Sequence, residues 1–183
     1  MSIFDNIITN NDNGITDYVG NNTHIYNNSI SHNSFSGILV YSSAAKDCDI
    51  HNNIIFNNGI GIHLESNLPA VIKYNIIRGN SNGIVSDSNN PSIISQNNFI
   101  GNTRQAYFTR DFMILARFFY PSLFFPKQKW NNNYWDDWKV KFPRPIRGET
   151  RIEFPPPFLI FELDLNSFEF DWHPAKKPYD IPG

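Results

Sequence analysis

The chain has 183 residues, a formal net charge of −2 and only 17% charged side chains. Such a weakly charged chain excludes a nucleic-acid partner held by a basic surface. The single cysteine, Cys48, excludes an internal disulfide and any cysteine-based metal motif. No apolar run is long enough to span a bilayer, and "MSIFDNIITN" lacks the features of a signal peptide.

An internal repeat fills the first 102 residues. Isoleucine recurs at steps of 22, 25, 22 and 22 residues, and asparagine, apolar and glycine positions follow it at fixed spacing. The aligned columns are Ile3, Ile25, Ile50, Ile72 and Ile94; Asn6, Asn28, Asn53, Asn75 and Asn97; Ile8, Ile30, Ile55, Ile77 and Phe99; Asn11, Asn33, Asn58, Asn80 and Asn102; and Gly14, Gly37, Gly61 and Gly83, with Ala106 in the fifth copy. Fixed spacing of this kind is typical of a repeat architecture.

The period of the repeat predicts an all-β solenoid. Helical repeats need longer units and 3.6-residue periodicity, whereas short apolar pairs between Asn and Gly indicate strands and tight turns. About 22 residues suit one coil of a parallel β-helix, with coils about 4.8 Å apart. We therefore predict about five coils over residues 1–111, with isoleucine in the core. The turn asparagines are expected to tolerate left-handed backbone and to pass amide hydrogen bonds from coil to coil.

The composition changes after residue 102, where all four tryptophans and ten of the twelve prolines lie. Because an open solenoid end exposes unpaired strands and apolar core, residues 112–183 are predicted to form a capping or flanking segment. The tryptophans are interpreted as cap core rather than as sugar-stacking platforms. Nothing before Ile3 offers a cap, so either upstream coils or another chain is expected to cover the N-terminal face.

The best candidate site lies on one outward strip of the coils. Strand alternation points His63 and Glu65 outward, and Asp87 lies one coil above Glu65. The predicted ligand-binding strip comprises Tyr18, Tyr41, His63, Glu65, Asp87 and Arg110. Two carboxylates could act as acid and base on a glycoside or hold Ca²⁺. The structural alternative is a solvated face on which Asp87 pairs with Arg110 or a serine.

A second outward cluster contains His24, Asp49 and His51. Imidazole and carboxylate ligands suit Zn²⁺ or Cu²⁺, which makes these three weak metal candidates. Their spacing is not diagnostic, and a polar surface patch is the favoured interpretation.

The pattern I-x-x-N-x-I-x-x-N-x-x-G-I resembles the right-handed parallel β-helix repeats of the NosD-like and carbohydrate-binding or sugar-hydrolase group. Two tail pieces, "NNNYWDDW" and "FDWHPAKKPYDIP", are similar to the C-terminal ends of archaeal and bacterial NosD-like surface proteins. The resemblance implies a right-handed coil. It does not carry over a copper role, because soft ligands are limited to Cys48, Met113 and Met1. The acidic motifs of polygalacturonase-like enzymes are absent.

These observations predict a non-catalytic, secreted or cell-surface module that assembles with itself or binds glycan. The alternative is a polysaccharide hydrolase or lyase using Glu65 and Asp87. Expected partners are a second copy, docked head to tail on the uncapped N-terminal coil, and a glycan. No cofactor is expected, with Ca²⁺ as the one alternative.

Overall fold

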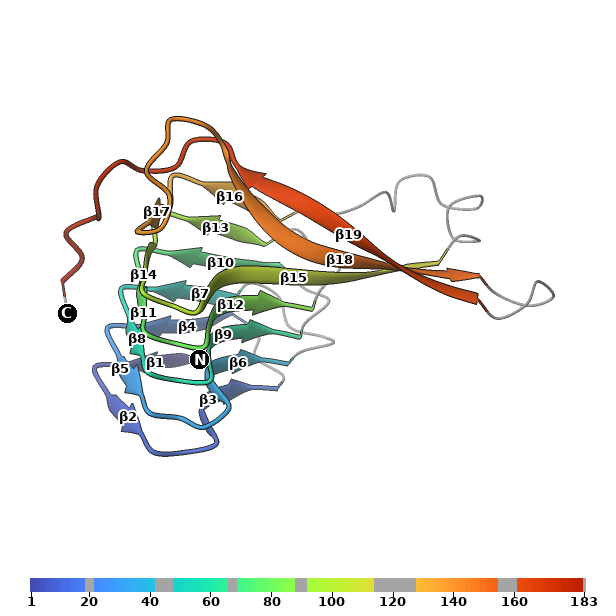
Figure 1. The fold of residues 1–183 in the computed structure, drawn as a ribbon. Helices are drawn as coiled ribbons and strands as arrows, with labels where there is room; N and C mark the ends of the chain where they lie inside the picture. The colour runs from blue at the N-terminus through green and yellow to red at the C-terminus, as the bar shows by residue number, and fades with distance from the viewer. Residues whose placement is uncertain are drawn as a thin grey trace.

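The computed structural model describes residues 1–18, 22–41, 48–65, 69–87, 92–113, 128–154 and 161–182. Every regular element in these ranges is a β-strand, and the strands stack coil upon coil into a solenoid (Figure 1). The described part of the chain contains no helix that could cross a membrane. The prediction of an all-β solenoid is therefore confirmed.

Three sheets form the walls of the solenoid. Sheet A contains β1 (Ser2–Phe4), β4 (Thr23–Tyr26), β7 (Cys48–His51), β10 (Ala70–Lys73), β13 (Ile93–Ser95) and β16 (Lys129–Asn131). Sheet B contains β2 (Ile7–Thr9), β5 (Ser29–Ser31), β8 (Ile54–Phe56), β11 (Ile76–Arg78), β14 (Asn98–Ile100) and β17 (Tyr134–Trp135). Sheet C contains β3 (Asn13–Asp17), β6 (Ser36–Val40), β9 (Ile60–Leu64), β12 (Asn82–Ser86), β15 (Arg104–Met113), β18 (Arg144–Phe154) and β19 (Phe161–Asp171). All neighbours pair in parallel except β18 and β19, which are antiparallel.

The apolar columns of the repeat fill the core in register. Ile25, Ile50 and Ile72 pair across sheet A and are fully buried, as are their counterparts in sheets B and C. Burial of β-branched side chains in stacked columns is the main favourable contribution to a fold of this kind. Above the last complete coil, Trp130 pairs with Ile94 and Trp135 stacks on Phe99 at 4.2 Å between ring centroids. These two buried tryptophans close the core, whereas Trp172 is 63% exposed, so the interpretation of the tryptophans as cap core was wrong for Trp172.

The asparagine columns form two hydrogen-bonded ladders at the inner corners of the coil. In the first ladder the backbone N–H and side-chain Nδ2 of Asn53 both donate to Asn75 Oδ1, at 3.0 Å each, and Asn28 donates to Asn53 in the same way. Nδ2 of Asn53 also donates to backbone carbonyls at Ile25 and His51. The left-handed backbone lies one residue before the ladder asparagines, at positions that include Asp5, Asn27, Asn52, Tyr74, Gln96 and Asn132. The ladder prediction is confirmed, but the turn conformation belongs to the preceding residue.

Both ladders end on a carboxylate. Asn133 extends the first ladder, and its N–H and Nδ2 donate to Asp171 Oδ2 at 2.9 and 3.1 Å. In the second ladder Asn102 donates to Gln105 Oε1, and Gln105 Nε2 donates to Asp136 Oδ1. The hydrogen bonds from one ladder amide to the next run toward the C-terminal end, although Nδ2 groups such as that of Asn53 also donate to a carbonyl of the preceding coil. A buried or partly buried acceptor with negative charge is therefore the complementary terminus.

The glycine column is explained by close approach between coils. A Cβ built on Gly61 would lie 2.5 Å from the carbonyl oxygen of Gly83. In the fifth coil this place belongs to Gln105, because Ile84 pairs with Ala106 and Val85 with Tyr107. The alignment of Ala106 with the glycines was therefore wrong by one residue. Among the described residues, β15 pairs with β18 only from Phe108 onward, so no residue of β18 pairs with Gln105. The Gln105 side chain therefore has room to reach Asp136.

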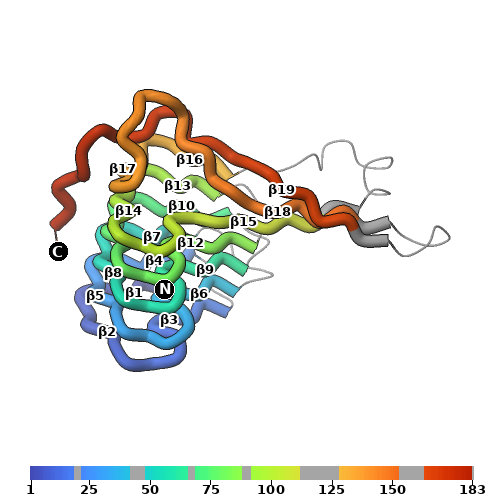
Figure 2. Tube along the Cα trace, viewed as in Figure 1, coloured from blue at the N-terminus to red at the C-terminus, as the bar shows by residue number. Residues whose placement is uncertain are grey.

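The segment predicted as a cap contributes to the sheets as well. β16 and β17 add one strand each to sheets A and B beyond residue 111, and the β18–β19 hairpin continues sheet C and projects past the coils (Figure 2). Within the segment 112–183 predicted as a cap, residues 114–127, 155–160 and 183 lie outside the described residues.

Candidate functional site

The predicted strip lies at the C-terminal ends of the strands of sheet C. Tyr41 N–H donates to Asp17 O, Glu65 N–H to Val40 O and Asp87 N–H to Leu64 O, which places Tyr18, Tyr41, Glu65 and Asp87 in successive coils. Tyr18 and Tyr41 are 62% and 51% exposed and meet edge to face at 5.7 Å. The structure thus brings both tyrosines and both carboxylates into one column, as the alternation predicted.

His63 lies between the two carboxylates of the strip. Its Nε2 is 2.8 Å from Asp87 Oδ2, and its Nδ1 is 3.3 Å from Glu65 Oε1. Although it points outward from the coil, His63 is only 5% exposed, and the ring of Phe35 contacts it edge-on at 5.8 Å. Outward direction in a strand therefore does not give exposure here, because neighbouring coils cover the imidazole.

Asp87 is held by two donors. Burial by itself raises the pKa of Asp87, but hydrogen bonds from His63 and Thr109 and the attraction of His63 together hold that pKa below its ordinary value. Thr109 Oγ1 donates to Asp87 Oδ1 at 2.7 Å, so both carboxylate oxygens are engaged. A carboxylate in this state is stabilised as an anion and is poorly available as a proton donor.

Arg110 does not lie on the strip. The register places Phe108 opposite Ser86, so Thr109 rather than Arg110 follows Asp87 in the column. Arg110 points inward, is buried and forms an ion pair with Glu169, while its guanidinium donates to Gln128 Oε1 at 3.1 Å. Burial lowers the pKa of Arg110 to about 10. The prediction that Arg110 binds ligand on the strip was wrong because it relied on the same one-residue alignment error at Ala106.

His24, Asp49 and His51 lie on the outer face of sheet A in two adjacent columns. Asp49 pairs with Lys73 at 3.4 Å, and His51 stacks on Tyr26 at 5.2 Å. Burial lowers the pKa of His51, with Lys73 and His24 acting in the same direction and Asp49 opposing them. Among the described residues, the three that bring His, Cys, Asp or Glu ligand atoms within 4.8 Å of one another are His63, Glu65 and Asp87.

Cys48 points into the core beside this patch. Burial, with the nearby Asp17 and Asp49 carboxylates, raises the pKa of the Cys48 thiol to about 12. A thiol in this state is neither a good nucleophile nor a good metal ligand near neutral pH.

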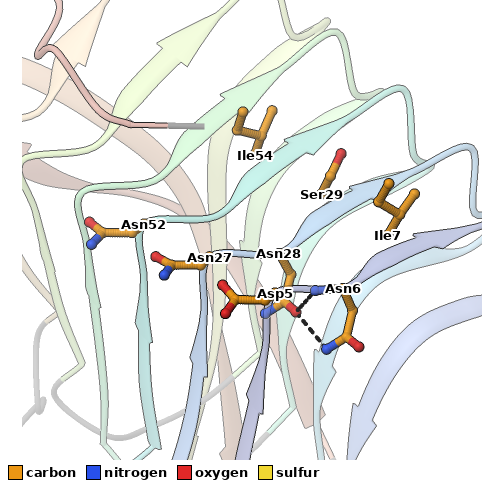
Figure 3. Close-up of a pocket in the computed structure, with 8 residues that line it drawn as sticks. All are labelled: Asp5, Asn6, Ile7, Asn27, Asn28, Ser29, Asn52 and Ile54. Carbon is orange, nitrogen blue, oxygen red and sulfur yellow. Dashed lines mark hydrogen bonds between the residues drawn. The ribbon is translucent and has the colours of Figure 1, made fainter.

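Sequence reasoning missed an open groove at the corner between sheets A and B. Figure 3 shows its two rows of side chains, one polar (Asp5, Asn27 and Asn52) and one on the outer face of sheet B (Ile7, Ser29 and Ile54). Asn28 Oδ1 accepts from Asn6 at its base. The signal that could have found it is the column of residues just before the ladder asparagines, which the left-handed turn directs outward.

Stacked parallel strands, in-register isoleucine columns and asparagine ladders define a parallel β-helix protein. A family model described as the right handed beta helix region matches residues 1–110, and the chain belongs to this family. The right-handed coil expected from the resemblance is thereby confirmed. No curated protein and no solved structure gave a significant match.

Proposed function

We propose that this chain is a non-catalytic β-helix module, of the NosD-like kind, that assembles head to tail with further copies at a cell surface or in a secreted array. The observation that carries the proposal is the complementarity of the two ends of the solenoid. Each end has exposed apolar side chains, and the two ends differ in the sign of their charge.

The N-terminal end presents unpaired strand edges with an acidic surround. β1, β2 and β3 are the terminal strands of their sheets, and Met1, Phe4 and Ile7 are 61%, 47% and 84% exposed. The first 23 residues contain three aspartates and no lysine, arginine or histidine; Asp5 and Asp12 are exposed, whereas Asp17 is buried. Such an edge is a template for another strand, and burial of its apolar side chains by a partner lowers the free energy of the assembly.

The C-terminal end offers positive charge, because Asp136 and Asp137 in its loop are held by Gln105 and Arg144, whereas Lys139 and Lys141 form no ion pair among the described residues. The loop between β17 and β18, orange in Figure 1, lies at the far end of the solenoid from β2 and β3. It contains "KVKF", in which Lys139 and Lys141 alternate with Val140 and Phe142, which are 52% and 73% exposed. The loop therefore complements the N-terminal edge in two properties: both surfaces expose apolar side chains, and the lysines of the loop are opposite in charge to the aspartates of the edge. Because the contact joins two different surfaces, it is heterologous and gives filaments unless the rotation closes a ring.

The experiment is sedimentation velocity over a concentration series, with negative-stain imaging of the most concentrated sample. We expect mass to grow with concentration and to fall as salt screens the charges. Ile7→Lys should abolish the growth, whereas Ile93→Lys, on the outer face of sheet A and 41% exposed, should leave it unchanged.

Charge reversal tests the pairing of the ends. Asp5→Lys with Asp12→Lys in one chain, and Lys139→Glu with Lys141→Glu in another, should each reduce self-association. Mixing the two variants should restore growth as alternating 1:1 assemblies, since the two reversed ends match each other and the two unchanged ends still match. A chain that stays monomeric at every concentration would overturn the proposal.

A second candidate role, glycan binding, is favoured by the exposed Tyr18–Tyr41 pair beside Glu65. Aromatic faces stack on sugar rings, and an adjacent carboxylate can accept hydrogen bonds from hydroxyl groups. Glycan-array binding that Tyr41→Ala removes would support it. The hydrolase or lyase alternative has less support, because Asp87 already uses both oxygens on His63 and Thr109.

A further inference from the structure

The surroundings of His63 pose a hydrogen-bonding problem. The ring is nine-tenths or more buried, and its Nδ1 has no hydrogen-bond partner among the described residues, although Glu65 Oε1 lies 3.3 Å away. If Nε2 carries the proton that bonds Asp87, then Nδ1 carries a lone pair. Two acceptors then face each other, one on a buried imidazole and the other on a partly exposed carboxylate, which is unfavourable unless a positive species lies between them.

The separation of these two atoms fits a metal ion. Zn²⁺ binds imidazole nitrogen and carboxylate oxygen at about 2.0–2.2 Å, and a tetrahedral angle then puts two ligand atoms about 3.4 Å apart. The observed 3.3 Å between Nδ1 and Oε1 is close to that edge of the tetrahedron. A hydrogen bond would instead require the carboxylate oxygen to lie near the axis of the N–H, and this contact does not meet hydrogen-bond geometry.

The other ring nitrogen has the partner that a metal-binding histidine needs. Metal-ligating histidines donate their second N–H to a carboxylate, which fixes the tautomer and orients the ring. Here Nε2 is 2.8 Å from Asp87 Oδ2, and Asp87 is itself held by Thr109 at 2.7 Å. Phe35 contacts the ring from the coil below and limits its rotation.

We propose that His63 Nδ1 and Glu65 bind a divalent transition-metal ion of the Zn²⁺ class, with Asp87 as the residue that positions the imidazole. The remaining ligands would be water, so the ion lies at the surface of sheet C beside Tyr41. A nitrogen ligand favours Zn²⁺ over Ca²⁺, which takes oxygen ligands. The inference is independent of head-to-tail assembly.

The test is isothermal titration of the full, metal-stripped chain with ZnCl₂, together with its thermal midpoint with and without Zn²⁺. We expect one ion per chain and a rise in the midpoint, because an ion that binds only the folded state stabilises it. Glu65→Gln should weaken binding at least tenfold and remove the rise. Asp87→Asn should weaken binding about 10- to 100-fold while keeping the stoichiometry, as expected for a positioning residue.

The matched control is Asp49→Asn, which removes a carboxylate near two other histidines on sheet A. It should leave Zn²⁺ affinity unchanged. His63→Gln should also lose binding, and Glu65→Gln keeps the test decisive if His63→Gln does not fold. No Zn²⁺ uptake, uptake that is equal in wild type and Glu65→Gln, or uptake that Asp49→Asn removes would each overturn the proposal.

Discussion

The two ends of the solenoid differ in whether the terminal amides of the asparagine ladders have hydrogen-bond partners. At the C-terminal end the last donors, Asn133 and Gln105, meet the carboxylates of Asp171 and Asp136. At the N-terminal end the side-chain oxygens of Asn6 and Asn11 accept no hydrogen bond from any residue that the structure describes. One end of each ladder is therefore satisfied within the chain, and the other presents acceptors at an exposed strand edge.

This difference shows that a ladder of amides has a direction. Each amide-to-amide hydrogen bond runs toward the C-terminus, so the ladder resembles a helix in having a donor end and an acceptor end. The donor end can be closed by a single carboxylate, and Asp171 closes it while also accepting from Trp135 Nε1 at 3.1 Å. The acceptor end needs N–H donors, which in this fold come from another coil.

The largest expected effect is on the free energy of unfolding, and it should differ between the middle of a ladder and its open end. Asn53→Ala leaves the donors of Asn28 without their acceptor and two backbone carbonyls without the Nδ2 donor, while Asn75 Oδ1 keeps only the backbone N–H of residue 53. We expect a loss of about 3–5 kcal/mol in the free energy of unfolding, measured by urea denaturation. Asn6→Ala at the exposed edge should cost less than about 1 kcal/mol. Equal losses would mean that the ladder contributes no more inside than at its end.

A smaller effect is expected from the glycine column. Gly61→Ala places a methyl group 2.5 Å from the Gly83 carbonyl and 3.0 Å from Ile77 Cγ2, and should cost about 2–3 kcal/mol by overpacking. Gly101→Ala is the control, because no atom lies within 4 Å of the added Cβ and only its φ of +59° is unfavourable. It should cost about 1 kcal/mol. Thermal unfolding of both variants would show whether coil-to-coil distance or turn conformation sets the requirement.

The closed end can be tested at its carboxylate. Asp171→Asn keeps the size of the side chain but removes the charge that accepts from Asn133 and Trp135. We expect a loss of about 2 kcal/mol, typical of hydrogen bonds to a buried charged group. Asp180→Asn, on an exposed residue nearby in sequence, should change stability by less than about 0.5 kcal/mol. A neutral result for Asp171→Asn would show that closing the ladder needs only an acceptor, not a charge.

Much of this architecture could be predicted from the sequence because stacked positions repeat. The columns that begin at Ile3, Ile8 and Asn6 predicted the core and the ladder, since identical coils must place identical residues on the same wall. The prediction failed in the fifth coil, where Gln105 replaces a glycine and the pattern no longer fixes the register. That one-residue error moved Arg110 from the core to the strip.

The site was harder to predict than the fold. Alternation correctly placed Glu65 and Asp87 in one column, but it could not show that His63, though outward, is covered by Phe35 and neighbouring coils. Nor could it show that Asp136 and Asp171 end the ladders, because these contacts join residues 31–38 positions apart without any repeat. The sequence contains information about contacts that recur and very little about contacts made once.

The smallest expected effect concerns the acid range and Asp87. Because the pKa of this carboxyl is lowered in the folded chain, its ionisation stabilises the fold above the unfolded-state pKa of about 3.9, and this stabilisation is lost as pH falls through the lower folded-state value. With EDTA present to remove metal, the difference in unfolding free energy between wild type and Asp87→Asn should shrink as pH drops from 6 to 3. Thr109→Val, which deletes one donor, should show a weaker version of the same trend. A difference in unfolding free energy that stays constant across this range would mean that the hydrogen bonds from His63 and Thr109 do not favour the charged form of Asp87.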